Sequence, residues 1–115
     1  MEFKFENQKV EQYFEDFTLM KKKIGQDLAR GVKKRCDNLK AANNFGIYLS
    51  TGLGKPHSLV GDLKGCYGVN ISDNYRLVIR PDTESLDPVS LKDCDTIIVE
   101  GVMDYHGQKN KWLIP

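Results

Sequence analysis

Apolar positions along the chain follow two different periods. At the start, Phe3 and Phe5 alternate with charged residues, which predicts a short half-buried strand. Asn7 comes next and suits a helix N-cap, because its side-chain oxygen can accept a hydrogen bond from a free first-turn N–H. Helical spacing then predicts one helix after Asn7 and a longer one from about Lys22 to Ala42. The apolar positions behind these helices are Val10, Tyr13, Phe14 and Phe17, then Ile24, Leu28, Val32, Cys36 and Leu39.

The middle of the chain changes from helical spacing to alternation. Residues 45–65 are rich in Gly, Ser and Thr, so they predict a loop that contains one helical turn near Ile47–Leu49. Apolar residues then alternate with polar ones over 67–71 and again over 75–79, with a tight turn between them. This pattern predicts a β-hairpin whose second strand stops at Pro81.

A last strand and an edge segment complete the predicted fold. Residues 82–95 form a polar connection with room for one helical turn, and the apolar run from Thr96 to Met103 predicts a central strand. The tail adds an edge segment at 112–114. The order of elements predicts an α+β fold, in which a helical hairpin packs on one face of a mainly antiparallel sheet. Without repeats or linkers, residues 1–115 are expected to form a single domain.

Composition narrows the classes of protein and site. No apolar run approaches the ~18 residues of a membrane span, and the N-terminus has no signal-peptide pattern, so we expect a cytoplasmic protein without a membrane partner. Cys36, Cys66 and Cys94 are odd in number and widely spaced, which indicates reduced, mostly buried thiols. With two histidines, no C-x-x-C pair and no phosphate-loop or dinucleotide motif, we expect neither a metal nor a small-molecule cofactor.

The charge is distributed unevenly although the net charge is only +1. Residues 21–40 hold eight lysines and arginines against two aspartates, a net charge of +6. Residues 82–95 hold five acids against one lysine, a net charge of −4. Outside the acidic segment 82–95 the chain is basic, which is compatible with a polyanionic partner such as RNA. Charge alone equally fits a solvated helix face and a solvated loop.

Two arginines lie on the second strand of the predicted hairpin. Arg76 and Arg80 are four residues apart, so they share one strand face and lie ~13 Å from each other. Each guanidinium could bind a phosphate bidentately. The alternative is a solvent face whose arginines pair with acidic neighbours. Lys64, before the hairpin, is a further candidate for binding an RNA phosphate.

Three consecutive polar residues end the predicted central strand. Of Asp104, Tyr105 and His106, the histidine can exchange a proton near neutral pH and the carboxylate can orient it. Tyr105 offers a ring for base stacking and a hydroxyl for hydrogen bonding. Alternation places Asp104 and His106 on one face and Tyr105 on the other. His57 is the remaining histidine, in the loop before the hairpin. A strand cap and an exposed loop histidine are the structural alternatives.

In their order along the chain, these pieces resemble the HigB branch of the RelE/ParE superfamily, the toxins of bacterial type II toxin–antitoxin pairs. The corresponding stretches are His57-Ser58-Leu59, Gly61-Asp62, Tyr67-Gly68-Val69, Asn74-Tyr75-Arg76 and Asp104-Tyr105-His106. The resemblance implies a RelE-like fold and metal-independent, ribosome-dependent cleavage of mRNA. It also implies a cognate antitoxin, of the helix-turn-helix type, as the protein partner.

The resemblance also implies roles for individual residues. His57 and His106 would act in acid–base chemistry, Asp104 would assist, Tyr105 would stack or hydrogen-bond, and Arg76 would neutralise charge at the phosphate. Two alternatives stay open: a ParE-like inhibitor of DNA gyrase, and an inactive homologue that only binds an antitoxin or nucleic acid. The nuclease is the leading interpretation; the nearly neutral net charge and Val60, where family members can carry a lysine, are what keep the inactive homologue open.

Overall fold

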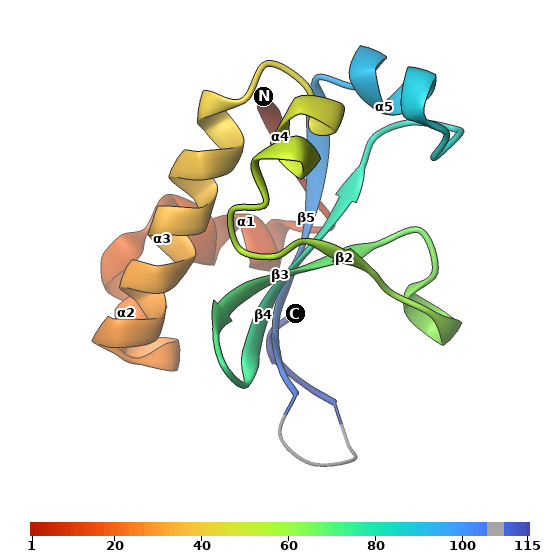
Figure 1. The fold of residues 1–115 in the computed structure, drawn as a ribbon. Helices are drawn as coiled ribbons and strands as arrows, with labels where there is room; N and C mark the ends of the chain where they lie inside the picture. Colours follow the sequence, from red (N-terminus) through yellow and green to blue (C-terminus); the bar gives the residue numbers. More distant parts are fainter. Residues whose placement is uncertain (106–109) are drawn as a thin grey trace.

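The chain folds into a twisted sheet with helices on one side (Figure 1). A computed structural model describes residues 1–105 and 110–115. Within these residues the sheet has six strands. Five of them lie in the order β1-β5-β4-β3-β2, and β6 also pairs with β5. Their bounds are β1 Glu2–Phe5, β2 His57–Ser58, β3 Tyr67–Ser72, β4 Tyr75–Pro81, β5 Thr96–Asp104 and β6 Lys111–Ile114.

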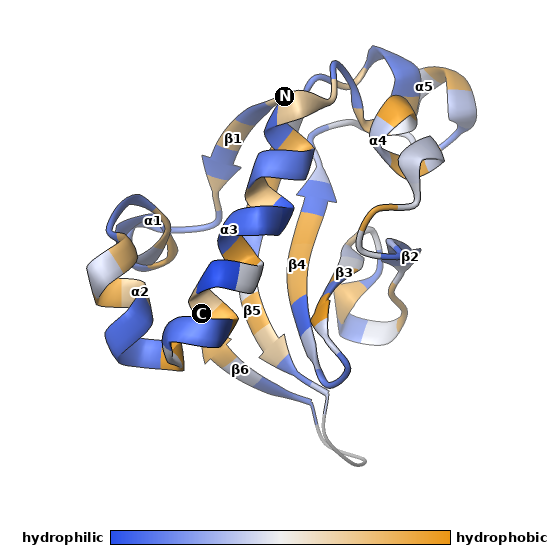
Figure 2. Cartoon of the chain, turned by 60° about the vertical axis from the view of Figure 1, so that its left-hand side comes forward, coloured by the Kyte–Doolittle hydropathy of each residue, from blue (hydrophilic) through white to orange (hydrophobic). Residues whose placement is uncertain are grey.

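The helices precede most of the strands in the chain. Their bounds are α1 Gln8–Glu15, α2 Phe17–Ile24, α3 Gln26–Ala41, α4 Phe45–Thr51 and α5 Pro88–Asp93, with a short 3₁₀ turn at Gly61–Leu63. Helix α3 lies in front of the sheet, with β5 behind it and β4 beside it (Figure 2). The predicted α+β class is confirmed, with an N-terminal strand, then helices, then a mainly antiparallel sheet. Among the described residues, no helix combines the length and apolar character needed to cross a membrane.

Strand β5 organises the sheet. It runs parallel to β1 and antiparallel to β4 and β6, so the first and last strands of the chain share one of its edges. Its register with β4 shifts between Val78 and Ile79, and Glu100 is the extra residue of this bulge. A bulge bends the strand locally, which matters for the acidic side chain it carries.

The prediction of two helices was wrong, because the chain forms three before residue 42. Asp16 ends α1 and starts α2, where its Oδ1 accepts from the Leu19 N–H at 3.0 Å. Gly25 then separates α2 from α3 with φ 89° and ψ 160°, a conformation that essentially only glycine adopts. The N-cap at Asn7 is confirmed, since its Oδ1 accepts from the Val10 N–H at 3.0 Å.

The prediction of a loop with one helical turn over residues 45–65 was also incomplete. Asn44 caps α4 by accepting from the Ile47 N–H at 2.8 Å, so the single turn expected near Ile47–Leu49 is a longer helix. The rest of the segment holds the short strand β2 and the 3₁₀ turn. Helix α5 lies in the polar connection, where Asp87 is its N-cap. Asparagine and aspartate begin these helices because their oxygens satisfy free N–H groups.

The sheet separates a large core from a small one. The large core lies between the sheet and the helices; its fully buried side chains include Val32, Leu39, Phe45, Leu77, Ile79, Val99 and Val102. The small core lies on the other face and consists of Cys66, Val78 and Met103, with Leu59, Leu63 and Tyr105 packed against them. The three cysteines are buried, as predicted. Burial raises the pKa of the Cys36 thiol to about 12 and that of the Cys66 thiol to about 11.

Candidate nucleic-acid-binding site

Several of the predicted site residues lie on the sheet face that the helices leave uncovered. Cross-strand partners point to the same face of a sheet. The register pairs Gly68 with Val78, and Val78 belongs to the small core rather than to the helix-side core. Arg76 and Arg80 flank Val78 on the same strand face, as predicted from their spacing. We call this surface the open face of the sheet.

Arg76 and Tyr105 are in direct contact there. The Cζ atom of Arg76 lies 5.2 Å from the centroid of the Tyr105 ring, within the range of a cation–π interaction. Nη1 of Arg76 donates to three carbonyls near the β3–β4 turn: Ser72 at 2.9 Å, Asp73 at 3.1 Å and Tyr75 at 3.1 Å. Burial raises the pKa of the Tyr105 phenol, although the nearby guanidinium acts in the opposite direction. The ring and the cation thus form one preorganised unit.

His57 lies on the short edge strand β2, in register with Gly68. A Cβ atom placed on Gly68 would be 3.1 Å from Nε2 of His57 and 3.2 Å from Cε1, so the imidazole lies over the glycine. The ring is exposed, and its Nδ1 is 3.2 Å from the Lys55 carbonyl oxygen. The missing side chain at Gly68 is what lets the histidine approach the open face. Two strands separate β2 from β5, so His57 is on the order of 10 Å or more from Tyr105.

Asp104 is placed differently from Tyr105. It is in register with Tyr75, which is two residues before Leu77 and therefore shares its strand face. Leu77 belongs to the helix-side core, so Asp104 lies on the opposite face from Arg76. His106 lies outside the described residues. Lys64 is exposed at the end of the 3₁₀ turn that leads into β3. The structure therefore brings Arg76 and Tyr105 together, with His57 on the same face.

Arg80 follows the alternative that the sequence left open, pairing with acidic neighbours. Its Nε donates to Oε1 of Glu100 at 3.1 Å, and its Nη2 lies 3.4 Å from Oε2 of Glu6. The Cys66 thiol donates to the same Glu100 oxygen at 3.7 Å. Burial, followed by a hydrogen bond with Glu6, raises the pKa of the Glu100 carboxyl, against the effect of Arg80. Sequence reasoning missed both glutamates, because Glu100 comes from the bulge in β5 and Glu6 directly follows β1.

Asn70 is a further residue of the open face that the sequence analysis did not select. It is the register partner of Arg76. Its Oδ1 atom and the Nε atom of Arg76 are both buried and have no hydrogen-bond partner within the described part of the chain. A polar residue directly opposite a candidate arginine in a predicted hairpin is the signal that could have identified it.

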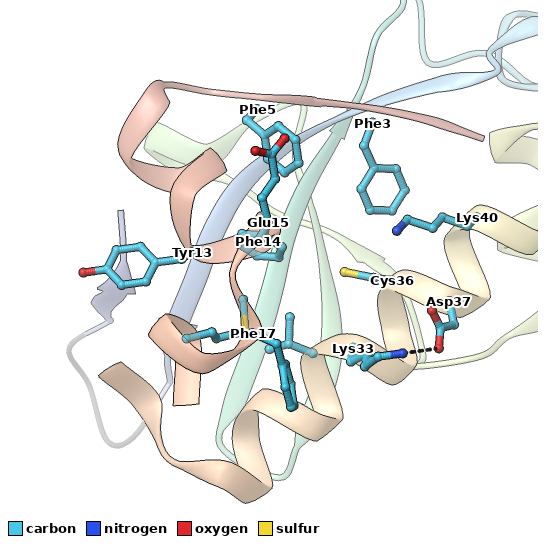
Figure 3. A pocket seen from close by; sticks show the side chains of 12 residues that line it. Phe3, Phe5, Tyr13, Phe14, Glu15, Phe17, Lys33, Cys36, Asp37 and Lys40 are labelled. Atoms are coloured by element: carbon cyan, nitrogen blue, oxygen red, sulfur yellow. Dashed lines mark ion pairs between the residues drawn. The ribbon is translucent and has the colours of Figure 1, made fainter. Parts of the chain in front are cut away.

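A separate groove of about 320 Å³ opens on the helix side of the molecule (Figure 3). Lys40 lies over the Phe3 ring, with 5.3 Å between its Nζ and the centroid, and Lys33 forms an ion pair with Asp37 at 3.6 Å. None of the predicted site residues lines this groove. Its lining consists of Phe3, Phe5, Tyr13, Phe14, Glu15, Phe17, Met20, Val32, Lys33, Cys36, Asp37 and Lys40.

The described residues do not suggest a metal centre. Across 1–105 and 110–115, no three His, Cys, Asp or Glu side chains are grouped so that they could hold a metal ion. The chemical groups that the open face offers are a guanidinium, a phenol, an imidazole and an amide. Such groups bind phosphates, stack on bases and exchange protons.

Comparison with known proteins places the fold among bacterial toxins. The YoeB–YefM complex from Staphylococcus aureus has a chain that is 20% identical, with a TM-score of 0.55, over 93% of this chain and 98% of that one. The YoeB/ParE toxin from Agrobacterium tumefaciens gives the same TM-score and identity, over 93% of this chain and 100% of that one. No protein-family model and no curated protein sequence matches. The chain therefore has the fold of the YoeB/ParE-type toxins.

Proposed function

We propose that this chain is the toxin of a type II toxin–antitoxin pair and that it cleaves ribosome-bound mRNA without a metal ion. The observation that carries the proposal is the Arg76–Tyr105 unit on the open face of a toxin-type fold. An arginine stacked on a tyrosine can bind a phosphate while the aromatic ring contacts a base. The ordered motifs from His57 to His106 support the HigB-like branch within that fold.

The reaction that fits these residues is transesterification of the RNA backbone. A ribose 2′-oxygen bonds to the adjacent phosphorus while the bond from phosphorus to the 5′-oxygen breaks. A base takes the proton of the 2′-hydroxyl, and an acid gives a proton to the leaving 5′-oxygen. We assign these steps to His57 and His106. Asp104 lies on the opposite face of the sheet from Arg76 and His57, so we assign it only to assisting His106. Arg76 neutralises the charge that develops on the phosphate.

The two other residues proposed to bind phosphate, Lys64 and Arg80, differ in how accessible they are to RNA. Lys64 is exposed and presents its ammonium to solvent beside the hairpin. Arg80 is engaged by Glu100 and Glu6, so an RNA phosphate would have to replace one of these carboxylates. We therefore expect Lys64 and Arg76 to contribute more to RNA binding than Arg80. Binding of this kind weakens with rising salt, because phosphate contacts release counterions.

The protein partner is proposed to be a cognate helix-turn-helix antitoxin, and both would act in the cytoplasm with the ribosome. Two of the similar solved structures are complexes of YoeB with YefM. The aromatic groove on the helix side offers such a partner apolar pockets, with Lys33 and Lys40 among its lining residues. Glu15 and Asp37 line the groove as well, so its charges balance. We infer that a segment of the antitoxin with apolar anchors binds this groove through its aromatic pockets.

Inducible expression tests the function directly. We expect growth arrest and discrete cleavages of cellular mRNA by primer extension, both lost when Asp104 and His106 are changed together to alanine. Lys34→Ala, on an exposed position of α3, is the control and should keep both effects. Equal toxicity of the double variant would contradict the catalytic assignment. Induced DNA damage with intact mRNA would instead indicate a gyrase inhibitor, and tight antitoxin binding without cleavage would indicate an inactive homologue.

A further inference from the structure

Trp112 adds an indole ring to the open face of the sheet. Its register partner is Met103, and Met103 is also the partner of Arg76, so these residues form one row across β6, β5 and β4. Cross-strand partners leave a sheet on the same side, and Met103 belongs to the small core of the open face. Trp112 is 38% exposed, so a ligand on this face can reach it.

Two glycines make room for rings on either side of Val78. Cζ3 of Trp112 would lie 3.1 Å from a Cβ atom placed on Gly101, so the indole packs over this glycine. Gly101 and Gly68 are the two register partners of Val78, and the imidazole of His57 lies over Gly68. Neighbouring strands are about 4.8 Å apart, so the two glycines are ~10 Å from each other. The indole therefore belongs to the same surface as the candidate site.

The indole also forms part of the wall of a pocket of about 240 Å³. The other lining residues include two apolar and three acidic ones, Leu63, Cys66, Glu6, Asp62 and Glu100. Drug-sized ligands occupy pockets of roughly 300–1,000 Å³, so this pocket suits a smaller group such as one nucleobase. Arg80 balances only part of the negative charge, which repels a phosphate. The amino group of a base, in contrast, can donate hydrogen bonds to carboxylates.

The position of the pocket connects it to the proposed RNA site. Two strand spacings, ~10 Å, separate Arg76 in β4 from Trp112 in β6. A single-stranded RNA whose phosphate binds Arg76 can therefore place a nearby base at Trp112. Proteins that bind single strands combine cationic side chains for the backbone with aromatic side chains on which bases stack. The open face has both kinds of group within this distance.

We propose that Trp112 and its pocket bind one unpaired base of the RNA, on a nucleotide near the one whose phosphate Arg76 binds, an inference that rests on the proposed function. The indole stacks on the face of the base, and the carboxylates of the pocket accept hydrogen bonds from its exocyclic amino group. Uracil lacks such a group, so the pocket favours cytosine over uracil among the pyrimidines. Trp112 is a binding residue in this role and takes no part in proton transfer.

The fluorescence of Trp112 tests the stacking directly, because it is the only tryptophan in the 115-residue chain. Short oligocytidylate and oligouridylate strands of equal length are titrated into the protein; their bases have the same size and differ at the amino group. We expect oligocytidylate to quench the indole emission and to bind about tenfold more tightly than oligouridylate. Binding of oligocytidylate without quenching, or equal affinities for the two strands, would overturn the proposal.

Variants of Trp112 separate stacking from folding. Trp112→Leu should weaken oligocytidylate binding about tenfold, measured by the anisotropy of a labelled strand, whereas Trp112→Phe keeps an aromatic ring and should retain most of the affinity. Phe17→Leu is the matched control, because Phe17 is 37% exposed but lines the groove on the helix side, and it should leave RNA binding unchanged. Thermal unfolding of each variant establishes that it is folded.

Distinct outcomes separate this proposal from the proposed function. An unchanged affinity in Trp112→Leu, or a lower unfolding temperature as its only effect, would show that the indole has a structural role and would overturn the base pocket. Growth arrest and mRNA cleavage by a wild-type protein whose fluorescence RNA does not quench would count against the pocket and leave the nuclease standing. Quenching and Trp112-dependent RNA binding without growth arrest would instead count against the nuclease and leave the pocket standing.

Discussion

Individual side chains on the open face owe their environment to distant parts of the chain. Arg76 and Arg80 share a strand face, as the period of two predicts. Their partners differ: Arg76 contacts local carbonyls and Tyr105, whereas Arg80 pairs with Glu6 and Glu100. These glutamates are 74 and 20 residues away from Arg80 in the sequence. The alternation of residues along a strand predicts to which face a side chain points, but it does not predict which carboxylate pairs with it.

The raised pKa of the Glu100 carboxyl predicts how the stability of the fold varies with pH. Its side chain is only 14% exposed, and burial raises its pKa above the usual value of 4.5. The folded state therefore holds the proton more tightly than the unfolded chain does. This contribution to stability is present below pH 4.5 and is lost as the pH rises through the folded-state pKa. Ionised Glu100 at neutral pH then costs stability.

We expect Glu100→Gln to raise the unfolding temperature at neutral pH, because glutamine keeps an oxygen acceptor for Arg80 without the buried charge. The difference from the wild type should shrink as the pH falls from neutral to 4.5, and it should not change further below 4.5. Thermal unfolding followed by circular dichroism over this pH range measures it. Glu84→Gln, in the exposed connection before α5, is the control. A difference that grows toward low pH would contradict the assignment.

Elements were predicted well where a period is regular and poorly where a cap interrupts it. The strands at 67–72 and 75–81 follow their alternation closely. The helices from α1 to α3 were read as two, because the apolar positions continue across the breaks at Asp16 and Gly25. An aspartate that caps a helix and a glycine between two helices are short signals. They are easily hidden within a longer amphipathic stripe.

Gly25→Ala tests the break between α2 and α3. Nothing lies within 4 Å of a Cβ atom placed there, so the substitution creates no clash and its cost is conformational. We expect the free energy of unfolding to fall by about 1–3 kcal/mol, the cost of holding a non-glycine residue in this region. Urea denaturation measures the change, with Lys23→Ala in the last turn of α2 as the control. An unchanged urea midpoint would show that the turn adapts.

At the scale of the whole molecule, the sheet separates two surfaces that sequence reasoning could not tell apart. The open face carries Arg76, Tyr105 and His57, and the helix side carries the aromatic groove. The groove draws its residues from β1, α1, α2 and α3. Phe3 and Phe5 were predicted to be half-buried strand residues, but the helices that complete the groove with them could be found only from the three-dimensional fold.

This separation predicts that the two proposed properties, mRNA cleavage and antitoxin binding, can be lost independently. We expect Arg76→Ala to abolish growth arrest and mRNA cleavage while leaving antitoxin affinity unchanged. Lys40→Glu should weaken antitoxin binding by about tenfold, because it reverses a charge in the groove, and should leave toxicity intact but no longer neutralised. Isothermal titration calorimetry with purified antitoxin and growth assays measure the two effects. Loss of both properties in either variant would contradict two independent surfaces.

Strand β5 also determines when the open face of the sheet is completed during synthesis. Strand β1 precedes the other described strands in the sequence, yet it pairs with β5, which follows β2, β3 and β4. Tyr105, the ring that Arg76 contacts, follows β5 directly. A nascent chain that stops before Thr96 carries the arginine but neither the ring nor the strand that joins the sheet together. For the proposed toxin, this topology means that the open face is complete only after β5 and Tyr105 have been synthesised.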